Sequence, residues 1–126
     1  MRCVFLAERK DLPYILHILE AIHNIESSIH ALNQNQFLKS LDAKDANVRR
    51  LEIIGEAVKN ISPHLKKAYP NVEWSKIAGT RDKITHHYFG VDFNIVWEII
   101  THDIPLLKDK ILKIKAHVEK TENISI

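Results

Sequence analysis

Apolar residues recur in this chain at alternating intervals of three and four positions, and this spacing restricts the fold more than any other feature of the sequence. Near the N-terminus the spacing runs through isoleucines from Ile15 to Ile29 and continues to Leu32. It returns from Trp97 to Val118. Because an α-helix turns once in about 3.6 residues, such side chains form one apolar face along the helix. Each segment therefore predicts a long helix that packs against other helices.

Two more helices are predicted between these segments. One runs from about Lys44 to Ile61 and ends before Pro63, since the residue before a proline disfavours helical geometry. The other runs from Trp74 to Gly90, because glycine often follows the end of a helix. Residues 37–41 and 63–70 predict short helical connectors.

Polar residues and a proline mark the limits of the first and last helices. Asp11 is expected to cap the first helix, and Asp92 the last. Pro105 lacks an amide hydrogen for the carbonyl of Thr101 and should bend the last helix. With no strand pattern in the sequence, we expect an all-α fold, an up-down bundle of four main helices with short connecting helices.

Composition limits the kind of protein that this chain can be. Its 126 residues suffice for one domain, 45% are hydrophobic and 27% are charged, as expected of a soluble globular protein. A lone cysteine, Cys3, excludes a disulfide framework and favours the reducing cytoplasm. No run approaches the roughly 18 apolar residues of a membrane span, so no membrane partner is expected. The net charge of +2 permits a nucleic-acid partner without requiring one.

Residues 81–88, RDKITHHY, concentrate charged and titratable side chains in the predicted third helix. On a helical wheel, Arg81 falls inside the apolar stripe. The residues of that stripe are Trp74, Ile77, Ile84 and Tyr88. Asp82 and His86 lie one turn apart beside the stripe, and His87 lies on its other side. Arg81 could thus form a structural ion pair with Glu52 or Glu56, or it could open onto a functional cleft.

The Asp82–His86 pair favours the functional interpretation. A carboxylate one turn before a histidine can fix the imidazole tautomer and raise its basicity. Histidine has a reference pKa near 6.5 and can exchange protons at neutral pH. The planar guanidinium of arginine can donate two parallel hydrogen bonds to phosphate oxygens. Arg81 and His86 together suggest RNA cleavage by the substrate's own 2′-hydroxyl. That chemistry needs two proton-transfer groups, and a two-fold dimer would supply a second set.

Other polar groups point less clearly to a site. Asn47 and Arg50 share a face with core residues of the second helix, which favours a capping or bridging role over substrate contact. The Glu20–His23 pair matches half of a di-iron motif that needs two copies, and His86 and His87 diverge too far to chelate one ion. We therefore expect neither a metal nor a cofactor.

The motif RDKITH resembles the Arg-polar-x3-His signature of HEPN domains, and RDKITHHY resembles the Arg-x4-His-x-Tyr form of HepT-like toxins. The likeness extends through RRLEIIGEAVKNI, YPNVEWSKIAGTRD and HHYFGVDFNIVWEII, from about residue 42 to 107. It implies one HEPN domain over residues 1–126, with residues 1–10 as an atypical N-terminal extension. It also implies a homodimer whose two motifs face a shared cleft.

The resemblance further implies a metal-independent endoribonuclease toxin of a prokaryotic type VII toxin–antitoxin system, acting on RNA rather than DNA. Position by position, Arg81 and His86 would be catalytic and Asp82 supporting, although many relatives have Asn in place of this aspartate. Tyr88 would be modified with AMP by a cognate antitoxin, a minimal nucleotidyltransferase of the MntA type, in a hetero-oligomer. Further candidates for RNA contact are Lys83, His87, Lys76 and Arg50.

Two other functions fit the same motif. The chain could be a non-catalytic HEPN subunit that binds nucleotide or substrate for a partner nucleotidyltransferase, with Arg81 gripping phosphate. It could also be a structural helical dimer in which Arg81 is merely salt-bridged. Cleavage of RNA, lost on substitution of Arg81 or His86, would separate the nuclease from both.

Overall fold

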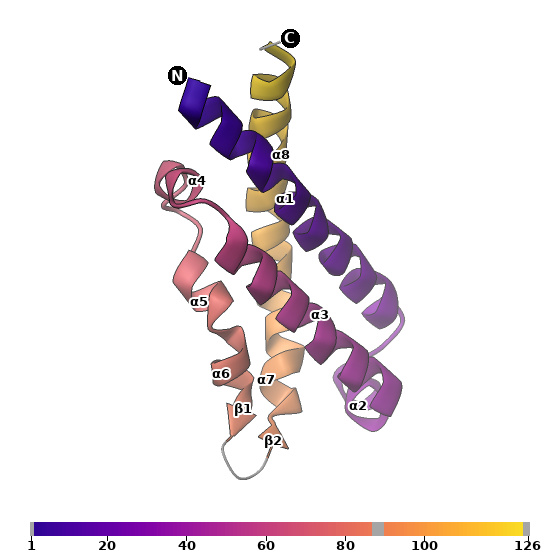
Figure 1. Cartoon of the computed structure of the whole chain (residues 1–126). Coiled ribbons are helices and arrows are strands. Elements are labelled where there is room, and N and C mark those ends of the chain that lie inside the picture. Colours follow the sequence, from indigo (N-terminus) through magenta and orange to yellow (C-terminus); the bar gives the residue numbers. More distant parts are fainter. Residues whose placement is uncertain (1, 87–89, 125–126) are drawn as a thin grey trace.

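Three long helices form the body of the protein (Figure 1): α1 (Arg2–Ile29), α3 (Leu41–Asn60) and α8 (Ile104–Ile124). The computed structural model describes the backbone of residues 2–86 and 90–124, and the side chains of residues 10–84 and 90–120. Helix α1 packs against both α3 and α8, and α8 lies behind the other two in Figure 1. The all-α bundle predicted from the apolar spacing is confirmed.

The predicted apolar faces of the long helices meet in the core. Side chains that are no more than 1% exposed come from α1, α3 and α8 alike. They include Ile15, Ile18, Ile22, Ile25, Ile54, Val58, Ile111, Ile114 and Val118. Burying such branched side chains is the main favourable contribution to folding, at about 1.5–3 kcal/mol each relative to exposure.

Helix α1 begins much earlier than predicted. Its backbone is helical from Arg2, so residues 2–10 extend α1 and Pro13 lies inside the helix. Asp11, predicted as the N-cap of this helix, is instead a buried residue within it, and that prediction is wrong. Its carboxylate accepts hydrogen bonds from the backbone amide (2.8 Å) and hydroxyl (2.6 Å) of Ser62. Asp11 therefore connects α1 to Ser62, the residue just before helix α4 (Pro63–Ala68).

Two short helices lie close to the predicted connectors, one between α1 and α3 and one after α3, although the first begins three residues before residue 37. Helix α2 (Gln34–Lys39) starts with a capping box in which the side chains of Asn33 and Gln36 each accept a hydrogen bond from the other's backbone amide. Helix α4 (Pro63–Ala68) has Ser62 as its N-cap, and the hydroxyl of Ser62 accepts from the amide of Leu65. These caps satisfy amides that the first helical turn leaves unpaired.

The third predicted helix is shorter than expected and is divided in two. Helix α5 (Trp74–Ala78) ends at Gly79, and α6 (Thr80–Ile84) follows directly. The chain then forms strand β1 (Thr85–His86), which pairs antiparallel with strand β2 (Gly90–Val91). Two-residue strands are too short to show an alternating pattern, so no strand could be predicted here from the sequence. The prediction of one helix from Trp74 to Gly90 is therefore wrong.

The last predicted helix has a widened turn near its start. Asp92 caps α7 (Phe93–Glu98) as predicted, accepting hydrogen bonds from the amides of Asn94 and Ile95. A π-helical turn, η1 (Ile99–Asp103), then leads into α8. Pro105 follows this turn, so the helix accommodates its missing amide hydrogen through a local change in winding. None of the described helices is long and apolar enough to cross a membrane.

Candidate functional site

Arg81 lies on the surface of α6 and is exposed, whereas the helical wheel predicted it inside the apolar stripe. Trp74 and Ile84 are buried as predicted. Because the helix is interrupted at Gly79, one wheel cannot describe both α5 and α6, and the prediction of a buried Arg81 is wrong. Among the described residues no carboxylate forms an ion pair with Arg81, so its guanidinium is available to a ligand.

Arg81 lines a groove of about 410 Å³ between α3 and the α5–α6 segment, which α1 closes on one side. The polar residues of its lining are Tyr14, His17, Arg49, Glu52, Glu56, Lys59, Asn60, Thr80 and Arg81. We call this hollow the Arg81 groove. Its volume falls in the range of small-molecule sites, about 300–1,000 Å³.

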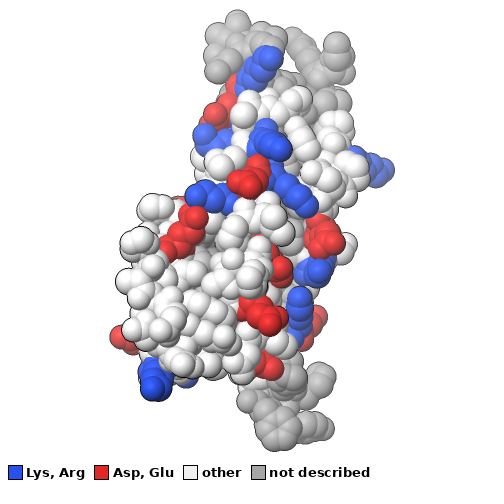
Figure 2. Space-filling model, turned by 180° about the vertical axis from the view of Figure 1, so that it is seen from behind, with Lys and Arg blue, Asp and Glu red and all other residues white. Residues whose placement is uncertain are grey.

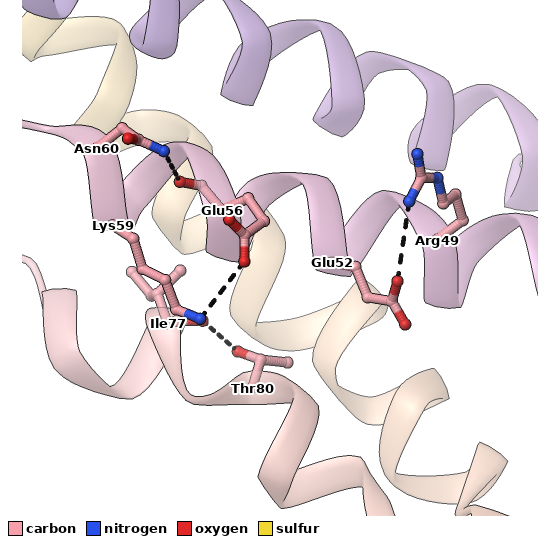
Figure 3. Close-up of polar contacts among 7 residues, drawn as sticks. All are labelled: Arg49, Glu52, Glu56, Lys59, Asn60, Ile77 and Thr80. Carbon is pink, nitrogen blue, oxygen red and sulfur yellow. Dashed lines mark hydrogen bonds and ion pairs between the residues drawn. The ribbon is translucent and has the colours of Figure 1, made fainter.

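The two acids considered as partners of Arg81 pair with cations of their own helix instead (Figure 3). Glu56 lies 3.4 Å from the ammonium of Lys59, and Glu52 lies 4.0 Å from the guanidinium of Arg49. Both pairs span three residues of α3. The predicted alternative of a structural ion pair between Arg81 and Glu52 or Glu56 is therefore wrong. The pairs offset the negative charge that would otherwise repel a phosphate from the groove.

Local contacts fix the opposite wall of the groove. The hydroxyl of Thr80 donates to the carbonyl oxygen of Ile77 at 2.8 Å, which ties the start of α6 to the end of α5 (Figure 3). Gly55 of α3 is buried, and a Cβ built there would lie 3.5 Å from the carbonyl oxygen of Ile77. That distance is an ordinary van der Waals contact, so α3 and α5 pack directly against each other here, with room for a side chain no larger than a methyl group. This wall positions Arg81 two residues beyond Gly79.

The rest of the RDKITHHY motif is placed differently from the prediction. Asp82 is exposed on α6, and His86 belongs to β1, so they are not one helical turn apart as predicted. The His86 side chain lies outside the described residues, as do His87 and Tyr88 entirely. The wheel argument that put Tyr88 beside Arg81 fails as well, because helix α6 ends at Ile84.

The structure separates the predicted RNA-contacting lysines from Arg81. Lys76 and Lys83 are exposed and line a second groove of about 320 Å³, between the α5–α6 segment and the η1–α8 segment. Lys76 pairs with Glu73 at 3.3 Å. Of the residues whose side chains are described, only Ile77, Thr80 and a core residue, Leu51, line both grooves. The α5–α6 segment therefore presents Arg81 to one groove and the lysines to the other.

Asn47 has the bridging role that the sequence favoured, and Arg50 contacts Asn47 within the same helix. Asn47 is fully buried, and its side-chain amide donates to the Ser28 hydroxyl of α1 (2.9 Å) and to the Ala43 carbonyl (2.8 Å). Arg50 is half-buried and donates to the Asn47 side-chain oxygen at 3.4 Å. The bond between Asn47 and Ser28 joins α3 to α1, whereas the other two lie within α3. Neither residue lines the Arg81 groove.

Charged side chains elsewhere do not form an obvious site. On the rear face, Lys and Arg alternate with Asp and Glu, and a broad area carries neither (Figure 2). Glu20 and His23, the half-motif for a di-iron site, are both exposed on α1. Within the described part of the chain, no three His, Cys, Asp or Glu side chains gather as metal ligands would.

Sequence reasoning did not identify most of the groove lining. Arg49, Glu52, Glu56 and Lys59 recur at intervals of three, four and three, which places them on one face of α3. This charged stripe was the available signal, but such stripes usually face solvent. Tyr14 and His17 of α1 gave no signal, because only the packing of α1 on α3 brings them to the groove.

Comparison with known proteins gives the family of this chain. The model of the "Ribonuclease HepT-like" family matches residues 18–114. A protein of Methanocaldococcus jannaschii, named as a gamma-glutamylcyclotransferase and provisionally as an RNase, is 41% identical over 116 residues. That match covers 91% of this chain and 52% of the relative, so the chain spans about half of that protein's length.

Two other relatives match over nearly their whole lengths. A protein of Caldanaerobacter subterraneus subsp. tengcongensis, provisionally named an RNase, is 40% identical over 81% of this chain and 91% of its own. A probable ribonuclease HepT of Thermococcus cleftensis is 40% identical over 86% of this chain and 98% of its own. No solved structure matches the chain. With the family model spanning α1 to α8 and the RDKITH motif between them, the chain belongs to the HepT-like ribonuclease family.

Proposed function

We propose that this protein is an RNA endonuclease in which Arg81 and His86 cleave the phosphodiester backbone. The observation that carries the proposal is an exposed arginine of the RDKITH motif, without an acidic partner among the described residues, at the edge of a polar groove. Membership of the HepT-like ribonuclease family supports the assignment to RNA.

The proposed reaction uses the 2′-hydroxyl of the substrate as the nucleophile. A base removes its proton, the 2′-oxygen bonds to phosphorus, and the bond from phosphorus to the 5′-oxygen breaks. An acid protonates that leaving oxygen, which yields a 2′,3′-cyclic phosphate and a free 5′-hydroxyl. Arg81 stabilises the negative charge that develops on the phosphoryl oxygens, and His86 transfers one of the protons.

A two-fold homodimer completes the proposed site. The reaction moves two protons on opposite sides of the phosphate, and each chain carries one Arg81/His86 set. A symmetric dimer with both motifs at one cleft would supply the second set. Light scattering of the purified protein tests this part of the proposal, and a monomeric mass in a preparation that cleaves RNA would contradict it.

The activity is tested by incubating purified protein with total RNA in EDTA. We expect degradation by the wild type, products with 2′,3′-cyclic phosphate ends, and loss of cleavage in Arg81→Ala and His86→Ala. Lys113→Ala, which removes an exposed cation from α8, should cleave like the wild type. Equal cleavage by wild type and His86→Ala would reject His86 as catalytic. RNA binding without cleavage would instead favour a non-catalytic binding subunit.

We further propose that the protein is the cytoplasmic toxin of a type VII toxin–antitoxin pair, neutralised when an MntA-type nucleotidyltransferase transfers AMP to Tyr88. The Arg-x4-His-x-Tyr arrangement in RDKITHHY supports this proposal. Added phosphates seven residues from Arg81 could occupy its guanidinium and repel RNA. Co-expression with the nucleotidyltransferase should raise the intact mass by one or more AMP units. An increase that persists in Tyr88→Phe would assign the modification to another residue.

A further inference from the structure

The Arg81 groove contains more recognition groups than phosphate binding requires. Beside Arg81 it presents acceptors, donors and aromatic rings, contributed by three separate parts of the fold. A phosphate needs only cationic donors, whereas a nucleobase needs a ring to stack on and hydrogen-bonding groups at its edge. The lining of the groove therefore fits a base next to a phosphate.

Glu56 and Lys59 supply the edge-recognising groups. In Figure 3 both side chains extend from α3 toward the α5–α6 segment that holds Thr80. Glu56 is 70% exposed and Lys59 is 57% exposed, so a ligand in the groove can reach both heads. One carboxylate oxygen of Glu56 contacts Lys59 at 3.4 Å, and the carboxylate keeps further acceptor positions for a ligand.

Tyr14 and His17 provide aromatic surface on the α1 side of the groove. Their rings meet edge to face, with centroids 6.4 Å apart. Tyr14 is half-buried and packs against the core, which orders its ring, while His17 is exposed. Stacking of a base on such a ring tolerates any base, so selectivity must come from the polar groups that line the same groove.

We propose that the Arg81 groove binds one base of the RNA beside the phosphate that Arg81 contacts, and that Glu56 makes guanine the preferred base. This inference rests on the proposed function. Guanine presents two adjacent donors, N1–H and the 2-amino group, which match the two oxygens of a carboxylate. Its O6 can accept from Lys59. Uracil offers one donor between two carbonyl oxygens, which a carboxylate repels.

Mapping of cleavage sites tests the inference. Wild type, Glu56→Gln and Glu73→Gln are incubated with RNA of randomised sequence, and the ends produced are sequenced. We expect guanine to be enriched over uracil at one position next to the cut by the wild type. The ratio should fall by about tenfold in Glu56→Gln, because the amide offers only one acceptor atom in place of two.

Glu73→Gln is the matched control. Like Glu56, Glu73 is exposed (68%) and pairs with a lysine three residues away, Lys76, at 3.3 Å. It lines the second groove, however, and not the Arg81 groove. Its base preference should equal that of the wild type. Cleavage by the wild type with the same base preference in Glu56→Gln would overturn this inference and leave the proposed function intact. Absence of cleavage by the wild type would overturn the proposed function and the inference together.

Discussion

Removing the carboxylate of Asp11 should destabilise the protein strongly. Asp11 is 2% exposed, and its two oxygens accept from the amide and hydroxyl of Ser62, 51 residues away. Hydrogen bonds to a charged group contribute about 1.5–3 kcal/mol each, and the amide of half-buried Ser62 would lose its partner. We therefore expect Asp11→Ala to lower the free energy of unfolding by about 3 kcal/mol.

Asp11→Asn is the matched variant, because it keeps the shape and one carbonyl oxygen for the Ser62 amide. Its new amide group can donate to the Ser62 hydroxyl, so the loss should be about 1 kcal/mol. For a chain of this size, 1 kcal/mol shifts the melting temperature by about 4 °C. Thermal unfolding followed by circular dichroism should thus show decreases of about 12 °C for Asp11→Ala and about 4 °C for Asp11→Asn.

The Ser62→Ala variant separates the Asp11 contact from the rest of the fold. If the two residues act together, the double variant Asp11→Ala/Ser62→Ala should lose less stability than the two single variants added. A melting temperature of Asp11→Ala within about 2 °C of the wild type would refute the reasoning. It would mean that α1 and α4 are held together by apolar packing alone.

Variants of Arg81, Asn47 and Gly90 test other features of the structure. Arg81→Ala should change the free energy of unfolding by less than about 0.5 kcal/mol in urea, since Arg81 is exposed. If the proposed function holds, the same variant lowers the rate of RNA cleavage by about 100-fold or more. A loss of more than about 1.5 kcal/mol in the free energy of unfolding would instead indicate that Arg81 has a structural role. Asn47→Ala should cost about 2 kcal/mol in the same assay, because it removes two hydrogen bonds that a fully buried side chain donates. A loss below about 0.5 kcal/mol would contradict the bridging role. Gly90→Ala should cost about 1 kcal/mol, because φ is +76° at Gly90 while a Cβ there meets no atom within 4 Å. Unchanged stability would show that the backbone at position 90 relaxes to a negative φ without cost.

The sequence identified part of the candidate site. The motif led to Arg81 because arginine, acid and histidine stand close together in the chain, a property that folding does not change. It did not reveal the surroundings of Arg81, because the wheel assumed a continuous helix through Gly79. The interruption at Gly79 and the end of α6 at Ile84 rotate the polar residues out of the assumed register. An error in helix register of this kind predicts a buried side chain where the structure has an exposed one.

The sequence alone determined the all-α fold and most of the core. The 3-4 spacing of apolar residues is a local property of a helix, and in a chain without a strand pattern the apolar faces can be buried only against other helices. Tertiary structure decided which polar groups meet. Asp11 looked like a cap for its own helix and bonds to Ser62 instead, while Tyr14, Glu56 and Arg81 line one groove although they lie far apart in the chain. Hydrogen bonds and grooves between helices depend on how those helices cross, and that geometry arises only when the whole core packs.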